Sequence, residues 1–144
     1  MHSKKLSSRS GFTLLEILMV VVIIGFLVTV AAVKMTNVMG TSRHTAALRQ
    51  IDAYKTVLGV YELDNGFYPS TEQGLQALIV QPSSMPIPAH WKGPYLDPPV
   101  LRPDPWGHPY VYRMPGQKLP TGYDLFSVGP DGVEGNEDDI GNWM

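Results

Sequence analysis

An apolar run of 22 residues, from Phe12 to Val33, is the feature that most limits what this chain can become. Glu16 is the only charged residue in the run. As a helix rising 1.5 Å per residue, the run would be about 33 Å long, which is enough to cross a bilayer. The rest of the chain, roughly 110 residues, has room for only one modest core. We therefore expect a membrane helix over 12–34, followed by a single domain over 35–144.

The charges are unevenly distributed along the chain. The formal net charge is −2, but Lys4, Lys5 and Arg9 precede the apolar run, so the remaining residues carry 8 basic and 13 acidic groups. An acidic domain is not expected to bind nucleic acid. The chain contains no cysteine, which excludes a disulfide framework, a thiolate zinc site and a cysteine nucleophile.

A cleavable secretory signal peptide is one interpretation of this amino terminus. It would combine the basic start with an apolar core and a cut near the small residues Ala31 and Ala32. Two features argue against it. The run is longer than the usual signal core of roughly 7 to 15 residues, and burying a carboxylate such as Glu16 in hydrocarbon costs several kcal/mol unless it is paired.

The motif Gly11-Phe12-Thr13-Leu14-Leu15-Glu16, placed between a basic leader and an apolar helix, resembles the type III leader of type IV pilins and pseudopilins. The resemblance implies that a prepilin peptidase removes residues 1–11, cuts between Gly11 and Phe12, and methylates the new amino group of Phe12. It also implies that Glu16 pairs with the amino terminus of a neighbouring Phe12 during assembly. The alternative is that Glu16 snorkels to the interface or becomes protonated.

The apolar spacing after the membrane segment predicts that the helix continues. Apolar residues recur every three or four positions, which gives one stripe facing a core. Asn65-Gly66 predicts the end of this helix near Asp64. The stripe consists of Ala47, Ile51, Tyr54, Leu58 and Tyr61.

The remaining residues predict an α+β domain. Ser70 and Gln73 form a capping pattern that predicts a short helix beginning near Thr71. The stretch 82–105 contains eight prolines and predicts an ordered loop, because proline cannot donate to a β ladder. Segments 110–113 and 123–128 predict two antiparallel strands that pack on the long helix. This arrangement resembles the type IV pilin-like architecture.

Three further strings resemble the major pseudopilin of type II secretion systems. The resemblance implies a single-pass inner-membrane protein with a periplasmic domain, which polymerises into a short filament that drives export of folded proteins. It implies contacts with other copies, minor pseudopilins, an assembly platform, a cytoplasmic ATPase and the prepilin peptidase. A type IV pilin for adhesion, twitching or DNA uptake is the alternative. The strings are Tyr61-Glu62-Leu63-Asp64-Asn65-Gly66-Phe67-Tyr68-Pro69, Asp104-Pro105-Trp106-Gly107-His108-Pro109-Tyr110 and Ser127-Val128-Gly129-Pro130-Asp131-Gly132.

No catalytic motif accompanies this pattern, and we expect no enzymatic activity. The four histidines, His2, His44, His90 and His108, are scattered along the chain without a nucleophile-elbow or zinc-protease context. Trp106 and Tyr110 are expected to anchor the core or a loop.

The carboxy-terminal segment places five acids within nine residues, from Asp131 to Asp139, among three glycines between 129 and 135. Such density repels itself unless solvent or a cation relieves it, and a hydrated tail is the simpler interpretation. The family resemblance implies a calcium site instead. Its side-chain ligands would be Asp131 and Asp138, with Asp139 a weaker candidate, and backbone carbonyls near Val128 and Ile140 would complete the shell. Glu134 and Glu137 are expected to face solvent.

The leader motif generates a prediction about processing. The mature protein should begin at Phe12 with a methylated amino group, because the basic leader lies before the cut and the apolar helix after it. Mass spectrometry of the protein purified from membranes measures this terminus directly. A mature terminus near Val33, as signal peptidase would leave, would contradict the prediction.

Overall fold

The computed structural model describes residues 11–144, and describes no side chains for 32–38. The expected leader therefore lies almost wholly outside the described residues. The chain divides into two compact units, one ending at Met39 and one spanning Gly40–Met144. The described elements are the α-helix α1 (Leu14–Asn65), the 3₁₀ helix η1 (Gly74–Leu78) and the strands β1 (Val111–Arg113), β2 (Asp124–Ser127) and β3 (Ile140–Gly141).

Helix α1 begins two residues later than the apolar run. The Thr13 hydroxyl accepts a hydrogen bond from the Glu16 backbone N–H at 3.2 Å, which caps an amide that has no partner within the helix. The helix ends as expected at Asn65, where Gly66 adopts a φ of 83° and its N–H donates to the Glu62 carbonyl. The prediction of one helix through the membrane segment and the amphipathic segment is confirmed.

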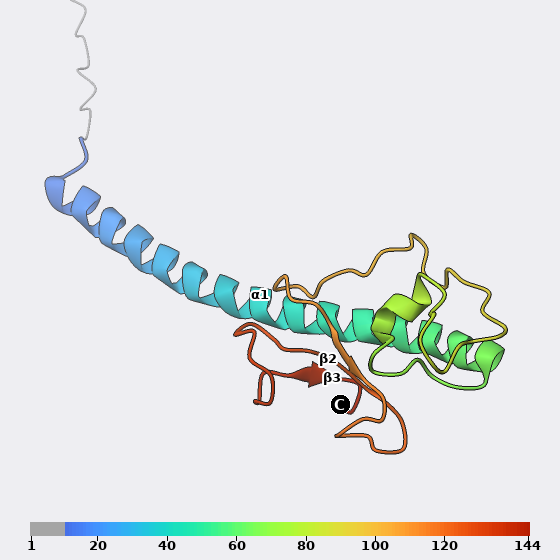
Figure 1. Ribbon diagram of the computed structural model, residues 1–144. Coiled ribbons are helices and arrows are strands. Elements are labelled where there is room, and N and C mark those ends of the chain that lie inside the picture. The colour runs from blue at the N-terminus through green and yellow to red at the C-terminus, as the bar shows by residue number, and fades with distance from the viewer. Residues whose placement is uncertain (1–10) are drawn as a thin grey trace, which may run out of the picture. The chain divides into compact units, whose positions relative to one another are not determined.

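The second unit has its core on the carboxy-terminal part of α1. The whole predicted stripe is buried, with no member more than 1% exposed. Tyr54 contacts Tyr110 edge to face, with ring centroids 5.5 Å apart, so the helix packs against the segment leading into β1. Figure 1 shows the strands beside this part of α1. The stripe residues are Ala47, Ile51, Tyr54, Leu58 and Tyr61.

The short helix expected near Thr71 is present only as a 3₁₀ turn that starts at Gly74. The capping pattern itself is formed, because Ser70 N–H donates to Gln73 Oε1 and Gln73 N–H donates to Ser70 Oγ. The side-chain amide of Gln73 also donates to the carbonyls of Ser84 and Pro86. Gly74 adopts a left-handed φ of 57°, which prevents an α-helix from running through this point.

The sheet has three antiparallel strands in the order β1-β2-β3. The two predicted strands are confirmed, each slightly shorter than expected. Strand β3 was not predicted, because two residues are too few to show an alternating pattern. It pairs Ser127 with Ile140 and Phe126 with Gly141, so the carboxy-terminal loop returns to the sheet.

The Pro-rich segment is ordered without regular pairing, as predicted (Figure 1). Side-chain contacts hold it to the end of α1 and to η1. Lys92 Nζ lies 2.6 Å from Asp64 Oδ1, and the Tyr95 hydroxyl accepts a hydrogen bond from Asn65. The Trp91 indole N–H donates to the Ala77 carbonyl at 2.9 Å. These contacts replace the ladder bonds that proline cannot make.

Asp124 organises the turn between β1 and β2 from a buried position. Its carboxylate accepts three backbone N–H groups, from Gln117, Lys118 and Leu119, at 2.6 to 2.9 Å. The side chain is only 1% exposed, and a Cβ at Gly116 would collide with it. A buried carboxylate is stable when its oxygens are satisfied in this way.

Removing this carboxylate should destabilise the domain. We expect Asp124→Ala to lower the free energy of unfolding by about 3 kcal/mol, because three amides lose a charged acceptor. Asp124→Asn should cost less, since it keeps one acceptor oxygen. Urea unfolding of a fragment beginning at residue 35 measures the change. Asp52→Ala, which removes an exposed carboxylate from α1, is the control; an equal loss in both variants would contradict a special role for Asp124.

Candidate functional site

The first unit presents an uncovered apolar surface. Every large apolar side chain from Phe12 to Val30 is exposed, by between 43% and 89%. The segment Leu14–Ala31 has a mean hydropathy of 2.9 and is long enough to cross a membrane. An apolar surface of this size needs lipid or other protein around it.

Glu16 is placed in the first turn of α1, within this apolar surface. Its side chain is exposed, and it forms no ion pair with any of the side chains described in 11–31 and 39–144. A carboxylate in such surroundings is costly until a positive partner arrives. The single chain leaves this group available to a partner outside itself.

The carboxy-terminal acidic segment forms a compact loop between β2 and β3, which we call the acidic loop (residues 129–139). Gly129, Gly132 and Gly135 all adopt positive φ values, between 70° and 94°. A side chain at Gly129 would collide with the carbonyl of Asp138, so glycine permits the two ends of the loop to meet.

Two of the predicted ligands are linked inside this loop. Asp131 accepts the Val133 N–H at 3.0 Å and the Asn136 side-chain amide at 2.6 Å. The other end of the Asn136 side chain accepts the Asp138 N–H at 2.9 Å. Asn136 therefore bridges Asp131 and Asp138, a role that the sequence did not reveal.

Asp139 has the position that best fits a bound cation. It is 7% exposed; its Oδ2 accepts the Gly135 N–H at 2.8 Å, while its buried Oδ1 has no hydrogen-bond partner. A buried carboxylate oxygen without a partner is costly, and a hard cation would satisfy it. Among the side chains that the structure describes, no three from His, Asp or Glu already converge on one point. A cation here would need backbone carbonyls to complete its shell.

Glu134 was expected to face solvent. It is exposed, but it also forms an ion pair. Its carboxylate forms a two-pronged ion pair with Arg113 of β1, at 2.5 and 2.8 Å. This mutual hydrogen bond lowers the pKa of Glu134 and raises the pKa of Arg113. The Arg113 guanidinium also lies 5.7 Å from the centroid of the Phe126 ring.

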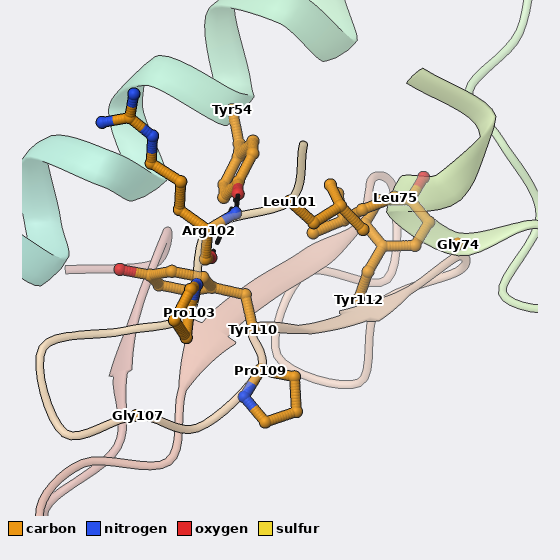
Figure 2. A pocket seen from close by; sticks show the side chains of 10 residues that line it. All are labelled: Tyr54, Gly74, Leu75, Leu101, Arg102, Pro103, Gly107, Pro109, Tyr110 and Tyr112. Carbon is orange, nitrogen blue, oxygen red and sulfur yellow. Dashed lines mark hydrogen bonds between the residues drawn. The ribbon is translucent and has the colours of Figure 1, made fainter. Parts of the chain in front are cut away.

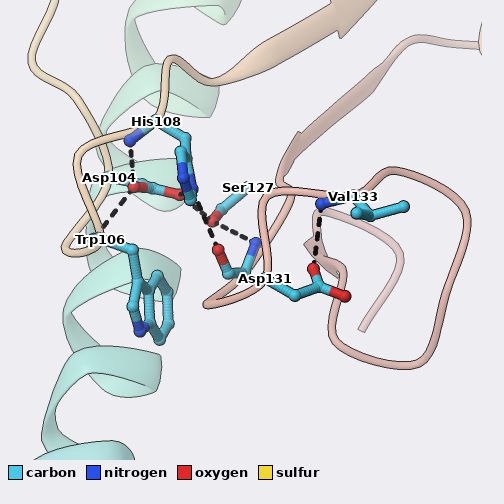
Figure 3. A network of polar contacts seen from close by, with 7 residues as sticks. Asp104, Trp106, His108, Ser127, Asp131 and Val133 are labelled. Carbon is cyan, nitrogen blue, oxygen red and sulfur yellow. Dashed lines mark hydrogen bonds and ion pairs between the residues drawn. The ribbon is translucent and has the colours of Figure 1, made fainter.

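A buried polar network lies beneath the acidic loop (Figure 3). Asp104 accepts the backbone N–H groups of Trp106 and His108 and the Ser127 hydroxyl. Ser127 Oγ in turn accepts the Gly129 N–H at 3.1 Å, and His108 Nδ1 lies 3.1 Å from the Gly129 carbonyl. The network ties the Asp-Pro-Trp-Gly-His turn to the start of the acidic loop.

The same network contains Ser, His and Asp, which sequence spacing did not bring together. Ser127 is fully buried and donates directly to Asp104, so the histidine does not stand between hydroxyl and carboxylate. A nucleophilic serine needs the histidine between its hydroxyl and the carboxylate, and it needs access to substrate. This arrangement fastens two loops. The predicted structural role of Tyr110 is confirmed by its burial, and Trp106 packs against the core.

A hollow of about 420 Å³ lies between α1, η1 and the segment before β1 (Figure 2). The Tyr54 hydroxyl spans its edge, accepting the Arg102 N–H at 2.9 Å and donating to the Arg102 carbonyl. Burial raises the pKa of Tyr54, so this hydroxyl stays protonated at neutral pH. The lining of the hollow is mostly apolar and contains no carboxylate, histidine or serine that could act in catalysis.

These features define a class of protein. A long apolar helix with one carboxylate near its start, continuing into a small α+β domain, is the architecture of pilin-like membrane-anchored subunits. The structure gives no catalytic arrangement that competes with this interpretation within the described residues.

Comparison with known proteins identifies the family. Residues 34–143 match the family model for type II secretion system protein G, and residues 6–32 match the prokaryotic N-terminal methylation motif. The chain belongs to the type II secretion system protein G family, the major pseudopilins.

Individual relatives agree along almost the whole chain. Type II secretion system core protein G of Pseudomonas aeruginosa is 46% identical, covering 94% of this chain and 95% of its own length. The Escherichia coli K12 protein of the same name is 44% identical over 94% and 91%. The crystal structure of the major pseudopilin from the type 2 secretion system of enterohaemorrhagic Escherichia coli matches with a TM-score of 0.67 and 40% identity, covering 74% of this chain and 87% of that one.

Proposed function

We propose that this chain polymerises from the inner membrane into the short type II secretion filament, with its second unit in the periplasm. The uncovered apolar surface of residues 12–30 is the observation that carries the proposal. Lipid can cover this surface before assembly, and neighbouring helices can cover it in a filament. Because both surroundings are apolar, transfer between them costs little free energy.

Glu16 supplies a specific contact for this transfer. The methylated amino group left at Phe12 after removal of 1–11 keeps a positive charge, and it would pair with the carboxylate of a neighbouring copy. Burying both charges is tolerable only when they meet, so the pairing would select one axial register. Minor pseudopilins, the assembly platform, the ATPase and the prepilin peptidase are the proposed partners. The relatives favour secretion over the alternative of an adhesive, twitching or DNA-uptake pilus.

Complementation of a deletion strain tests the function and the residue together. Deletion should make exoproteins accumulate in the periplasm, and the wild-type gene should restore secretion. Glu16→Ala should insert and be processed normally but restore less than about a tenth of filament assembly, because the neighbouring amino group loses its partner. Glu72→Ala, an exposed acid in the second unit, is the control. Loss of twitching with secretion intact would contradict the proposal, and normal filaments from Glu16→Ala would contradict the pairing.

We further propose that the acidic loop binds calcium. Asp131, Asp138 and Asp139 would hold it by side chains, with the carbonyls of Val128 and Ile140 beside them. The partnerless oxygen of Asp139 and the all-oxygen donor set support this choice. Bound calcium would offset the repulsion among five acids and fasten a loop that no disulfide holds.

Calcium should therefore raise the melting temperature of the second unit. At about 100 times the dissociation constant the gain is roughly 2.7 kcal/mol, or on the order of 10 °C for a domain of this size. Thermal unfolding of a fragment beginning at residue 35, with calcium or chelator, measures it. Asp131→Ala and Asp138→Ala should abolish the shift, while Glu137→Ala should retain most of it. Identical unfolding curves with and without calcium in the wild type would contradict the calcium site and favour the interpretation as a solvated acidic segment.

A further inference from the structure

We propose that Arg113 and Glu134 are positioning residues that hold the acidic loop in its cation-ready shape before any cation binds. We call this ion pair the strap. The proposal rests on the calcium site proposed above. It assigns a function to Arg113, a residue of β1 outside the loop.

The geometry of the strap suits a fixed contact. Arg113 Nη1 donates to Glu134 Oε1 and Nη2 donates to Oε2, so the pair restricts orientation as well as distance. The guanidinium lies over the Phe126 ring of the neighbouring strand, which limits its freedom on the sheet. Arg113 is 28% exposed and Glu134 41%, so the pair is partly shielded from water. One end of the strap is thus part of the sheet, and the other is the middle of the loop.

The strap leads directly to Asp139. Gly135, which follows Glu134 in the chain, donates its N–H to Asp139 Oδ2. This bond fixes the rotation of the carboxylate and leaves the buried Oδ1 without a partner. Asp139 also precedes β3, which pairs with β2. Residues 134 and 139 are therefore both held to the sheet, and the loop between them has little freedom.

The charge of Arg113 and its effect on the shape of the loop predict opposite effects on calcium affinity. Arg113 reduces the negative potential of the loop, so its charge alone weakens cation binding. Its hold on Glu134 pre-organises the loop, which strengthens binding by removing an ordering cost. We infer that pre-organisation dominates, because the pair is bidentate and lies outside the proposed ligand set. Neutralising Arg113 should then weaken calcium binding, although the loop becomes more negative.

Hydrogen exchange of the full chain in detergent micelles measures how far the strap restricts the acidic loop when no calcium is bound. In excess chelator, Arg113→Gln and Glu134→Gln should each speed amide exchange in the peptide covering 133–139 by at least about fivefold. The double variant should be no faster than either single variant. Lys92→Gln, which breaks the ion pair with Asp64 at the end of α1, should leave this peptide unchanged. An unchanged exchange rate in Arg113→Gln, or an equal acceleration throughout the core strands, would overturn the proposal that the strap holds the loop.

Calcium titration of the same proteins by calorimetry reads the positioning role. Arg113→Gln should raise the dissociation constant by about threefold to tenfold, and Arg113→Lys should recover only part of this loss. Saturating calcium should cancel most of the exchange difference. Tighter binding by Arg113→Gln would overturn the positioning role in favour of charge alone. Absence of calcium binding in the wild type would overturn the calcium site and the positioning role with it, whereas exchange in chelator would still decide whether the strap closes the loop.

Discussion

One helix that must satisfy two different surroundings governs this molecule. From Phe12 to Val30 the large apolar side chains of this segment are all uncovered, while from Ala47 onward a narrow stripe of α1 is completely buried. The first surface requires lipid or other helices, and the second requires a small domain folded against it. Under the proposed function, such a chain would leave the bilayer for a filament without unfolding its second unit, since the two surfaces belong to different compact units.

The small sheet creates a second requirement, because nine strand residues provide few ladder bonds. Three buried carboxylates fasten the loops instead. Asp124 binds the turn between β1 and β2, and Asp104 ties the Asp-Pro-Trp-Gly-His turn to Ser127. Asp139 holds the acidic loop at Gly135. In a chain without cysteine, charged acceptors for backbone N–H groups perform the task that disulfides perform in many small secreted domains.

Much of this organisation follows from local pattern. The helix stripe, its end at Asn65-Gly66, the Pro-rich loop and two strands are each determined by neighbouring residues, and all were predictable. Strand β3 and the 3₁₀ form of η1 were not, since one is too short for a pattern and the other depends on the left-handed φ of Gly74, which the sequence does not reveal. Arg113 and Glu134 lie 21 residues apart, and nothing in either segment indicates that they meet.

The three buried acids also differ in how fully their oxygens are hydrogen-bonded, and this difference supports the proposal that Asp139 is a metal ligand. Asp124 receives three N–H donors and Asp104 receives two N–H donors and a hydroxyl. Asp139 receives one and keeps a buried oxygen without a partner. Since an unsatisfied buried oxygen costs free energy, a bound cation would stabilise Asp139 more than the other two carboxylates. The burial of Asp139 could not be predicted from the sequence, because it depends on β3 returning to the sheet.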